Sequence, residues 1–245
     1  MRRSLIGSVG QIFARLRSAA PMPAAMTLAD DEPLATLPAL LLDTETTGLD
    51  VTRDRIVSIA GLPHHGGSPD GALPPLDHLL HPGIRIPKSS TAIHGIDDRM
   101  VATAPTLGLL WGSIQLAWQG RVLVGHNIGF DIAVLQHEAA RHRLPFHAPA
   151  GALDLGLLYA GLKPRAAQIT LERIAEDFSI SLDGRHSAMG DAESAAGIWR
   201  RMLPALGRIG IATLGDARRL MQRQRDLLQR QDRAGWALDL LLPPR

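Results

Sequence analysis

Two carboxylates stand two residues apart, directly after a run of apolar residues. Asp43 and Glu45 follow residues 39–42, and side chains two apart on a β-strand point to the same face of the sheet. No Lys or Arg lies between them, so their negative charges need a cation from elsewhere. Oxygen ligands favour hard divalent ions such as Mg²⁺ and Mn²⁺, which also bridge to phosphate groups. The pattern therefore predicts a metal-dependent phosphodiesterase.

Two later motifs add acidic residues and a histidine. Residues 124–131 run from Val-Gly-His-Asn to Phe-Asp, which places Asp131 at the start of an expected helix. Residues 185–191 contain His186 five positions before Asp191. Each motif alone has an ordinary explanation, because negative charge is favoured in the first turn of any helix. Their combination in this order favours a single site.

The three motifs together resemble those of the DEDDh exonuclease family, whose members include the proofreading epsilon subunit of bacterial DNA polymerase III. The resemblance runs from about residue 39 to residue 203 and includes Thr-Ala-Ile-His-Gly-Ile at 91–96. A histidine five residues before the last acid distinguishes this branch from the branch with tyrosine there. The resemblance implies a ribonuclease H-like fold and 3′→5′ release of nucleoside 5′-monophosphates.

The resemblance also implies a role for each residue that matches a motif. Two Mg²⁺ or Mn²⁺ ions would be held, partly through water, by Asp43, Glu45, Asp131 and Asp191. His186 would be the general base for the attacking water, a role that suits an imidazole with a pKa near 6.5. His94 resembles the family residue near the terminal nucleotide, and Thr46 or Thr47 would hydrogen-bond the same sugar-phosphate.

Other residues in and near these motifs are interpreted as structural. His126 is expected to pack, Asn127 to fix a strand-to-helix turn, and Gly125 to allow a close backbone approach. A zinc site from His137 and His142 is poorly spaced for a helix, where ligands four residues apart are expected.

The elements that must position these residues alternate between strand and helix patterns. Three early strands in quick succession predict antiparallel pairing, and the later alternation predicts a mixed β-sheet flanked by helices, an α/β fold. Pro63 is expected to break the second strand, because proline has no backbone N–H to donate to a neighbouring strand. The expected strands are 39–43, 55–62, 76–81, 121–125 and 152–154. The expected helices are 105–118, 128–143, a helix ending at 162, 171–178 and 187–202.

The chain divides into three expected parts. Residues 1–37 form an N-terminal extension, with an amphipathic helix to about residue 17 and a linker rich in Ala and Pro. Residues 38–204 form the exonuclease domain, and residues 205–245 a basic C-terminal helical arm. After a break over 204–215, a helix from Asp216 would carry apolar residues seven apart, at Leu220, Leu227, Ala234 and Leu241. Packing of this helix on its own domain is favoured over a dimer or partner helix.

Charge is distributed unevenly along the chain. Residues 1–20 hold four Arg and no acid, and residues 199–245 hold ten Arg and four Asp, giving +4 and +6. Residues 21–198 hold twelve basic and twenty acidic residues, giving −8. Basic ends would attract a polyanionic substrate to a metal-charged body, although Arg also serves simply to solvate helix surfaces.

The remaining composition narrows the function class. The chain has no Cys, which excludes disulfides and zinc-thiolate sites and fits a reducing cytoplasm. No apolar run approaches the ~18 residues of a membrane span. Nucleic acid is the expected partner, with DNA 3′ ends favoured and RNA 3′-end trimming as the alternative. A third interpretation is a catalytically silent interaction module. The terminal helices could also bind a polymerase or another protein partner.

Overall fold

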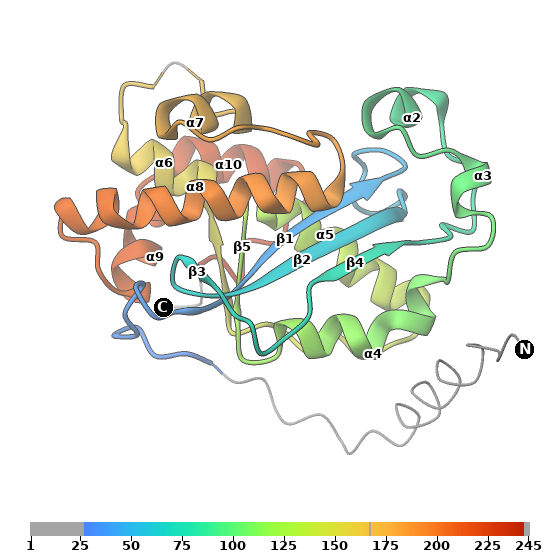
Figure 1. Cartoon of the computed structure of the whole chain (residues 1–245), viewed down its shortest axis with the longest axis horizontal. Coiled ribbons are helices and arrows are strands. Elements are labelled where there is room, and N and C mark those ends of the chain that lie inside the picture. The colour runs from blue at the N-terminus through green and yellow to red at the C-terminus, as the bar shows by residue number, and fades with distance from the viewer. Residues whose placement is uncertain (1–26, 167, 243–245) are drawn as a thin grey trace, which may run out of the picture.

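The computed structural model describes residues 27–166 and 168–242, and a mixed six-stranded sheet lies at its centre (Figure 1). The strand order is β3-β2-β1-β5-β6, and β4 also pairs with β2. β1 pairs antiparallel with β2 and parallel with β5, and β6 continues the parallel half. The predicted mixed sheet is thus confirmed. The strands are β1 Pro38–Thr46, β2 Ile56–His65, β3 Ser68–Pro69, β4 Leu76–Leu79, β5 Val122–Gly125 and β6 Gly151–Asp154.

The second strand is longer than predicted, because Pro63 does not interrupt it. β2 runs for ten residues and pairs with β1 along its whole length, with Pro63 opposite Leu40. On its other side β2 pairs with β4 only up to Gly61 and with β3 only from His64. Pro63 therefore lies in the gap between these two partners, where its missing N–H costs no ladder hydrogen bond.

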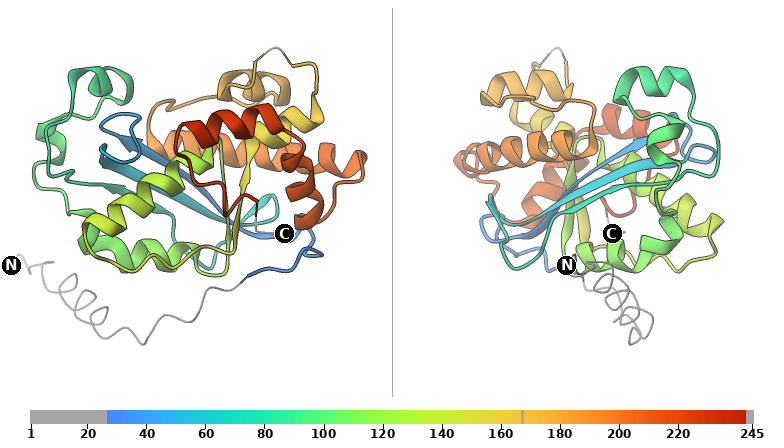
Figure 2. Two further views of the ribbon diagram at one scale, coloured as in Figure 1. Left: turned by 180° about the vertical axis from the view of Figure 1, so that it is seen from behind. Right: turned by 45° about the vertical axis from the view of Figure 1, so that its right-hand side comes forward.

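Helices cover both faces of the sheet. Helix α8 packs on one face against β1 and β2, while α4 and α5 lie on the other (Figures 1 and 2). The continuous apolar run of β1 fits this arrangement, because a strand buried on both faces has no polar side to alternate with. The helices are α2 Lys88–His94, α3 Asp98–Val101, α4 Leu107–Trp118, α5 Ile128–Arg141, α6 Leu155–Leu162, α7 Leu171–Phe178, α8 Ala188–Arg208, α9 Leu214–Gln222 and α10 Arg225–Arg233.

The carboxyl-terminal helices differ from the prediction in two ways. The expected break at residue 204 is wrong, since α8 continues through Pro204 to Arg208. The single helix expected from Asp216 is instead two helices, α9 and α10. Thr213 caps α9, because its hydroxyl oxygen accepts a hydrogen bond from the backbone N–H of Asp216. In return, the Asp216 carboxylate accepts a hydrogen bond from the backbone N–H of Thr213. This reciprocal capping box fixes the start of the helix three residues earlier than a cap at Asp216 would.

The arm packs on its own domain, as predicted. Leu241 is fully buried, and the backbone carbonyl of Leu240 accepts a hydrogen bond of 3.0 Å from Ala152 N in β6. The backbone of Ala237 donates to Gly129 O in α5 at 3.0 Å. Ala234, one of the four residues spaced seven apart, is exposed, so the heptad spacing does not form a seam.

The described part of the expected linker is also attached to the domain. Leu37 is fully buried, and Leu34 N donates to Ala212 O at 2.8 Å. The expected amphipathic helix lies outside the described residues. Among the helices of residues 27–166 and 168–242, none combines the length and apolarity needed to cross a membrane.

Candidate active site

Three carboxylates meet where β1 passes the first turn of α8. Asp43 and Glu45 project from the same face of β1, and Asp191 faces them from α8, which packs on that face. One oxygen from each lies within 4.8 Å of the other two. Among the described residues, this is the one group of three or more acidic, His or Cys donors with such spacing. We call these three residues the carboxylate cluster.

The cluster concentrates negative charge in a partly buried place. Burial and repulsion from Asp131 and Asp191 raise the pKa of Asp43 well above its ordinary value. Burial and the charge of Asp191 likewise raise the pKa of Glu45 to about 7. Ionising the cluster at neutral pH is therefore unfavourable unless a cation compensates it.

A fourth carboxylate, Asp131, borders the cluster from the first turn of α5. It is buried, and the hydroxyl of Thr44 donates to its Oδ1 at 2.6 Å. Thr44 lies between Asp43 and Glu45, so it points to the opposite face of β1 and reaches α5 instead of α8. Burial raises the pKa of Asp131 to about 7, although the Thr44 hydrogen bond opposes the shift. Thr44 is a site residue that the sequence analysis missed, and its position inside the first motif was the only signal.

Arg185 joins the last motif to the cluster. Its guanidinium contacts Asp191 Oδ2 at 2.5 Å and Glu172 Oε1 at 2.8 Å, and Nη1 lies 3.3 Å from His186 Nδ1. Burial still raises the pKa of Asp191, although Arg185 and His186 lower it in part. Arg185 is a second site residue that was not predicted from the sequence, although it stands at the start of the third motif.

His186 lies on the exposed loop before α8. Its φ of 65° is in the left-handed region, which histidine adopts more readily than most residues with a Cβ. The residue is exposed to solvent, and its imidazole lies close enough to Asp191 to lower the pKa of that carboxyl group.

The three predicted substrate contacts lie where α2 meets the end of β1. Ser90 Oγ donates to Thr47 O at 2.7 Å and fixes α2 over this turn. The backbone of Ile96 donates to His94 Nδ1 at 3.0 Å, so the proton is placed on Nε2, which is buried and has no hydrogen-bond partner in the described part of the chain. Thr46 and Thr47 hydroxyls instead donate within the turn, to Gly48 O at 2.6 Å and Asp54 Oδ1 at 2.8 Å. Of these three side chains, only that of His94 has a buried polar atom without a hydrogen-bond partner among the described residues.

The residues interpreted as structural behave as predicted. His126 Nε2 lies 3.1 Å from Ile169 O, and Asn127 adopts a left-handed conformation as the residue before α5. A Cβ on Gly125 would come within 2.7 Å of Leu42 O, next to Asp43. His142 pairs with Glu138 at 3.4 Å.

The donor set fits a hard divalent cation. All four carboxylates offer oxygen, and Asp191 Oδ1 is buried without a hydrogen-bond partner in the described part of the chain. An orphaned carboxylate oxygen is costly to bury, and a cation would satisfy it. A cation would also favour the ionised forms of Asp43 and Glu45, whose pKa values are raised.

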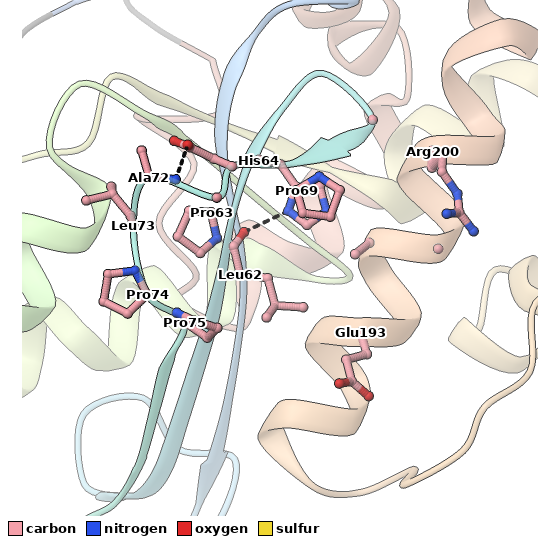
Figure 3. Close-up of a pocket in the computed structure, with 15 residues that line it drawn as sticks. Leu62, Pro63, His64, Pro69, Ala72, Leu73, Pro74, Pro75, Glu193 and Arg200 are labelled. Carbon is pink, nitrogen blue, oxygen red and sulfur yellow. Dashed lines mark hydrogen bonds between the residues drawn. The ribbon is translucent and has the colours of Figure 1, made fainter.

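A large cavity of about 770 Å³ lies away from the cluster. Figure 3 shows it between α8, which carries Glu193 and Arg200, and a wall that includes Pro63, Pro74 and Pro75. No member of the carboxylate cluster lines it. The reactive groups are therefore arranged around the end of β1 and not around this cavity.

Comparisons with known proteins agree with the motifs. The sequence profile of a family described as Exonuclease matches residues 40–199. A DNA polymerase III subunit epsilon-like protein of Rhodobacter capsulatus is 36% identical over 189 residues, which are 76% of this chain and 26% of that protein. A PolC-type DNA polymerase III of Lactococcus lactis is 29% identical over 155 residues, 63% of this chain and 9% of that protein. The chain thus spans about a quarter or less of the length of these relatives.

Solved structures share the fold. Exonuclease X in complex with 5′ overhanging duplex DNA matches with a TM-score of 0.57 and 23% identity, covering 75% of this chain and 99% of that one. E. coli Exonuclease I in complex with a dT13 oligonucleotide matches with a TM-score of 0.61 and 17% identity, covering 71% and 42%. The predicted ribonuclease H-like fold is confirmed.

Proposed function

Because the chain belongs to the exonuclease family, we propose that it is a metal-dependent 3′→5′ exonuclease that removes nucleoside 5′-monophosphates from DNA 3′ ends. The observation that carries the proposal is the convergence of Asp43, Glu45 and Asp191 within 4.8 Å, with Asp131 beside them. No one segment of the chain supplies this set. It comes from a strand and the first turns of two helices on opposite faces of the sheet.

The four carboxylates are the proposed ligands of two Mg²⁺ or Mn²⁺ ions. Two such ions would stabilise the charge on the attacking and leaving oxygens of an in-line displacement. Thr44 holds Asp131 by one oxygen, Oδ1, and so leaves Oδ2 available as a ligand. Arg185 holds Asp191 through Oδ2, which leaves the unpartnered Oδ1 available as a ligand.

His186 is the proposed general base. It lies on the solvent-open side of Asp191, where a water molecule approaches without crossing the core. An unprotonated imidazole nitrogen accepts the proton of that water as the phosphorus–oxygen bond forms. The 3′ oxygen of the preceding nucleotide then leaves with the electron pair of the broken bond.

His94 is proposed to contact the terminal nucleotide through Nε2–H, which lacks an internal partner among the described residues. Burial lowers the pKa of His94, so the ring is neutral at pH 7 and donates from one nitrogen only. The contacts proposed for Thr46 and Thr47 involve the turn that their hydroxyls stabilise.

A degradation assay tests the proposal. Single-stranded DNA, duplex DNA and RNA, each labelled at the 5′ end, are incubated with Mg²⁺, Mn²⁺ or EDTA. A ladder that shortens from the 3′ end, needs a divalent ion and is lost in Asp43→Asn supports the assignment. Asp183→Asn is the matched control, since it removes one exposed negative charge near His186 but outside the cluster.

The same assay separates the alternatives. Preferential shortening of RNA would replace the DNA assignment with 3′-end trimming of RNA. Hydrolysis that persists in EDTA, or that survives Asp43→Asn, would refute the mechanism. Absence of product on all three substrates, with metal binding intact, would favour an interaction module.

A further inference from the structure

A groove of about 290 Å³ lies between the end of α6 and the start of α10, and none of the four carboxylates of the candidate active site lines it. Four cationic side chains line it, and one acidic side chain, Asp226, lies among them. All four cations are exposed. We call this the arm groove, and its cations are Lys163, Arg223, Arg225 and Arg230.

Lys163 of the arm groove pairs with Asp177 at 3.5 Å, whereas its three arginines have no ion-pair partner among the described residues. In α9, Arg218 pairs with Asp30 at 2.6 Å and Arg219 with Asp216 at 2.7 Å. Within residues 27–166 and 168–242, neither Arg223 nor Arg225 has a carboxylate within 4.0 Å. Helix stability does not explain Arg225 either, because a positive charge in the first turn opposes the helix dipole.

The helix that begins at the arm groove ends against the first turn of α5, the turn that carries Asp131. Gly235, just after α10, lies against Val51 in the loop that follows β1. Ala237 bonds Gly129, two residues before Asp131, and Trp236 packs edge-to-face on Phe130 with ring centroids 6.0 Å apart. Seen from behind, α10 lies between α6 and the start of α5 (Figure 2).

We propose that the arm groove binds the phosphate backbone of the nucleic-acid strand upstream of its 3′ end. This proposal rests on the proposed function, because the 3′ end is taken to lie at the carboxylate cluster. The nine residues of α10 span about 14 Å at ~1.5 Å per residue. At the ~3.4 Å rise of one strand in B-form DNA, this corresponds to roughly four nucleotides. A trinucleotide with its 3′ end at the cluster is therefore expected to fall short of the arm groove.

The test compares Arg223→Ala/Arg225→Ala with Arg201→Ala/Arg208→Ala. Both double variants remove two exposed positive charges, and the second pair lies on α8 outside the arm groove. Binding of a labelled single-stranded 20-mer and of a trinucleotide is measured by fluorescence anisotropy in Ca²⁺, between 50 and 200 mM salt. Hydrolysis of both substrates is measured in Mg²⁺.

For the 20-mer, the arm-groove variant should raise Kd by roughly 10-fold at 50 mM salt, because two phosphate contacts are lost. At ~0.7 counterions per single-strand contact, the slope of log Kd against log salt should flatten by about 1.4. The difference from wild type should therefore shrink about 7-fold by 200 mM salt. Hydrolysis and binding of the trinucleotide should not change, nor should the α8 variant differ from wild type on the 20-mer.

An unchanged Kd for the 20-mer, equal losses in the two double variants, or an equal loss on the trinucleotide would overturn the proposal. Wild-type protein that binds the 20-mer through Arg223 and Arg225 but hydrolyses nothing would retain the arm groove and reject the exonuclease assignment. Hydrolysis of the 20-mer that does not depend on Arg223 and Arg225 would retain the exonuclease assignment and reject the arm groove.

Discussion

Replacing Thr44 with valine should weaken divalent-metal binding without removing any proposed ligand. Valine keeps the shape of the side chain but deletes the hydroxyl that donates to Asp131 Oδ1 at 2.6 Å. A hydrogen bond to a charged, buried group contributes about 2 kcal/mol. Because this bond favours the ionised carboxylate, its loss should raise the pKa of Asp131 by about 1.5 further units.

The size of the effect should depend on pH. With a pKa of about 7, Asp131 is half ionised at pH 7 in the wild-type protein. A pKa near 8.5 would leave about 3% ionised, so apparent metal affinity should fall about 15-fold at pH 7. At pH 9 the two proteins should differ by less than about twofold, since the carboxylate is mostly ionised in both.

Calorimetric titration with Mn²⁺ at pH 7 and pH 9 measures this directly and does not require turnover. Thr44→Ser keeps the donor and should bind within about threefold of wild type. The reasoning fails if Thr44→Val binds normally at pH 7, if its loss is equally large at pH 9, or if serine is no better than valine.

Four further outcomes are expected. The carboxylates of Glu45 and Asp131 have raised pKa values of about 7, so the folded protein binds more protons than the unfolded chain between about pH 4 and pH 7. The free energy of unfolding in EDTA should therefore fall as pH rises through that window, and a melting temperature that rises from pH 5 to pH 8 would contradict this. At pH 8 in EDTA, Asp43→Asn should melt at a higher temperature than wild type but gain less on addition of Mg²⁺, as measured by differential scanning fluorimetry. His186→Ala should reduce kcat by roughly 10²–10⁴-fold while calorimetry shows unchanged Mn²⁺ binding, whereas lost metal binding would instead assign His186 to the metal site. Gln231→Ala removes the side chain that donates to the buried Asp154 carboxylate at 3.2 Å, and it should lower the melting temperature by roughly 2–10 °C. An unchanged melting temperature would mean that this contact of the arm contributes nothing to stability.

The sequence by itself determined the local parts of the site. An apolar run followed by acids two apart fixes a buried strand with both carboxylates on one face, because side chains alternate along a strand whatever surrounds it. Turn and helix-start patterns likewise located Gly125, Asn127 and the helix that carries Asp131. These features depend on residues that are neighbours in the sequence, so they can be predicted from the sequence alone.

Tertiary structure decided the contacts between distant residues. Thr44 bonds Asp131 across 87 positions, and Asp191 meets Asp43 only because α8 packs on the face of β1 that carries it. The run of Arg in residues 199–245 is compatible with either solvation or binding, and packing of α9 paired some of these side chains while leaving Arg223 and Arg225 exposed in a groove. Pro63 is tolerated in β2 because its neighbours stop pairing on one side at that residue. Register and packing set such distances, and no periodicity in the sequence encodes them.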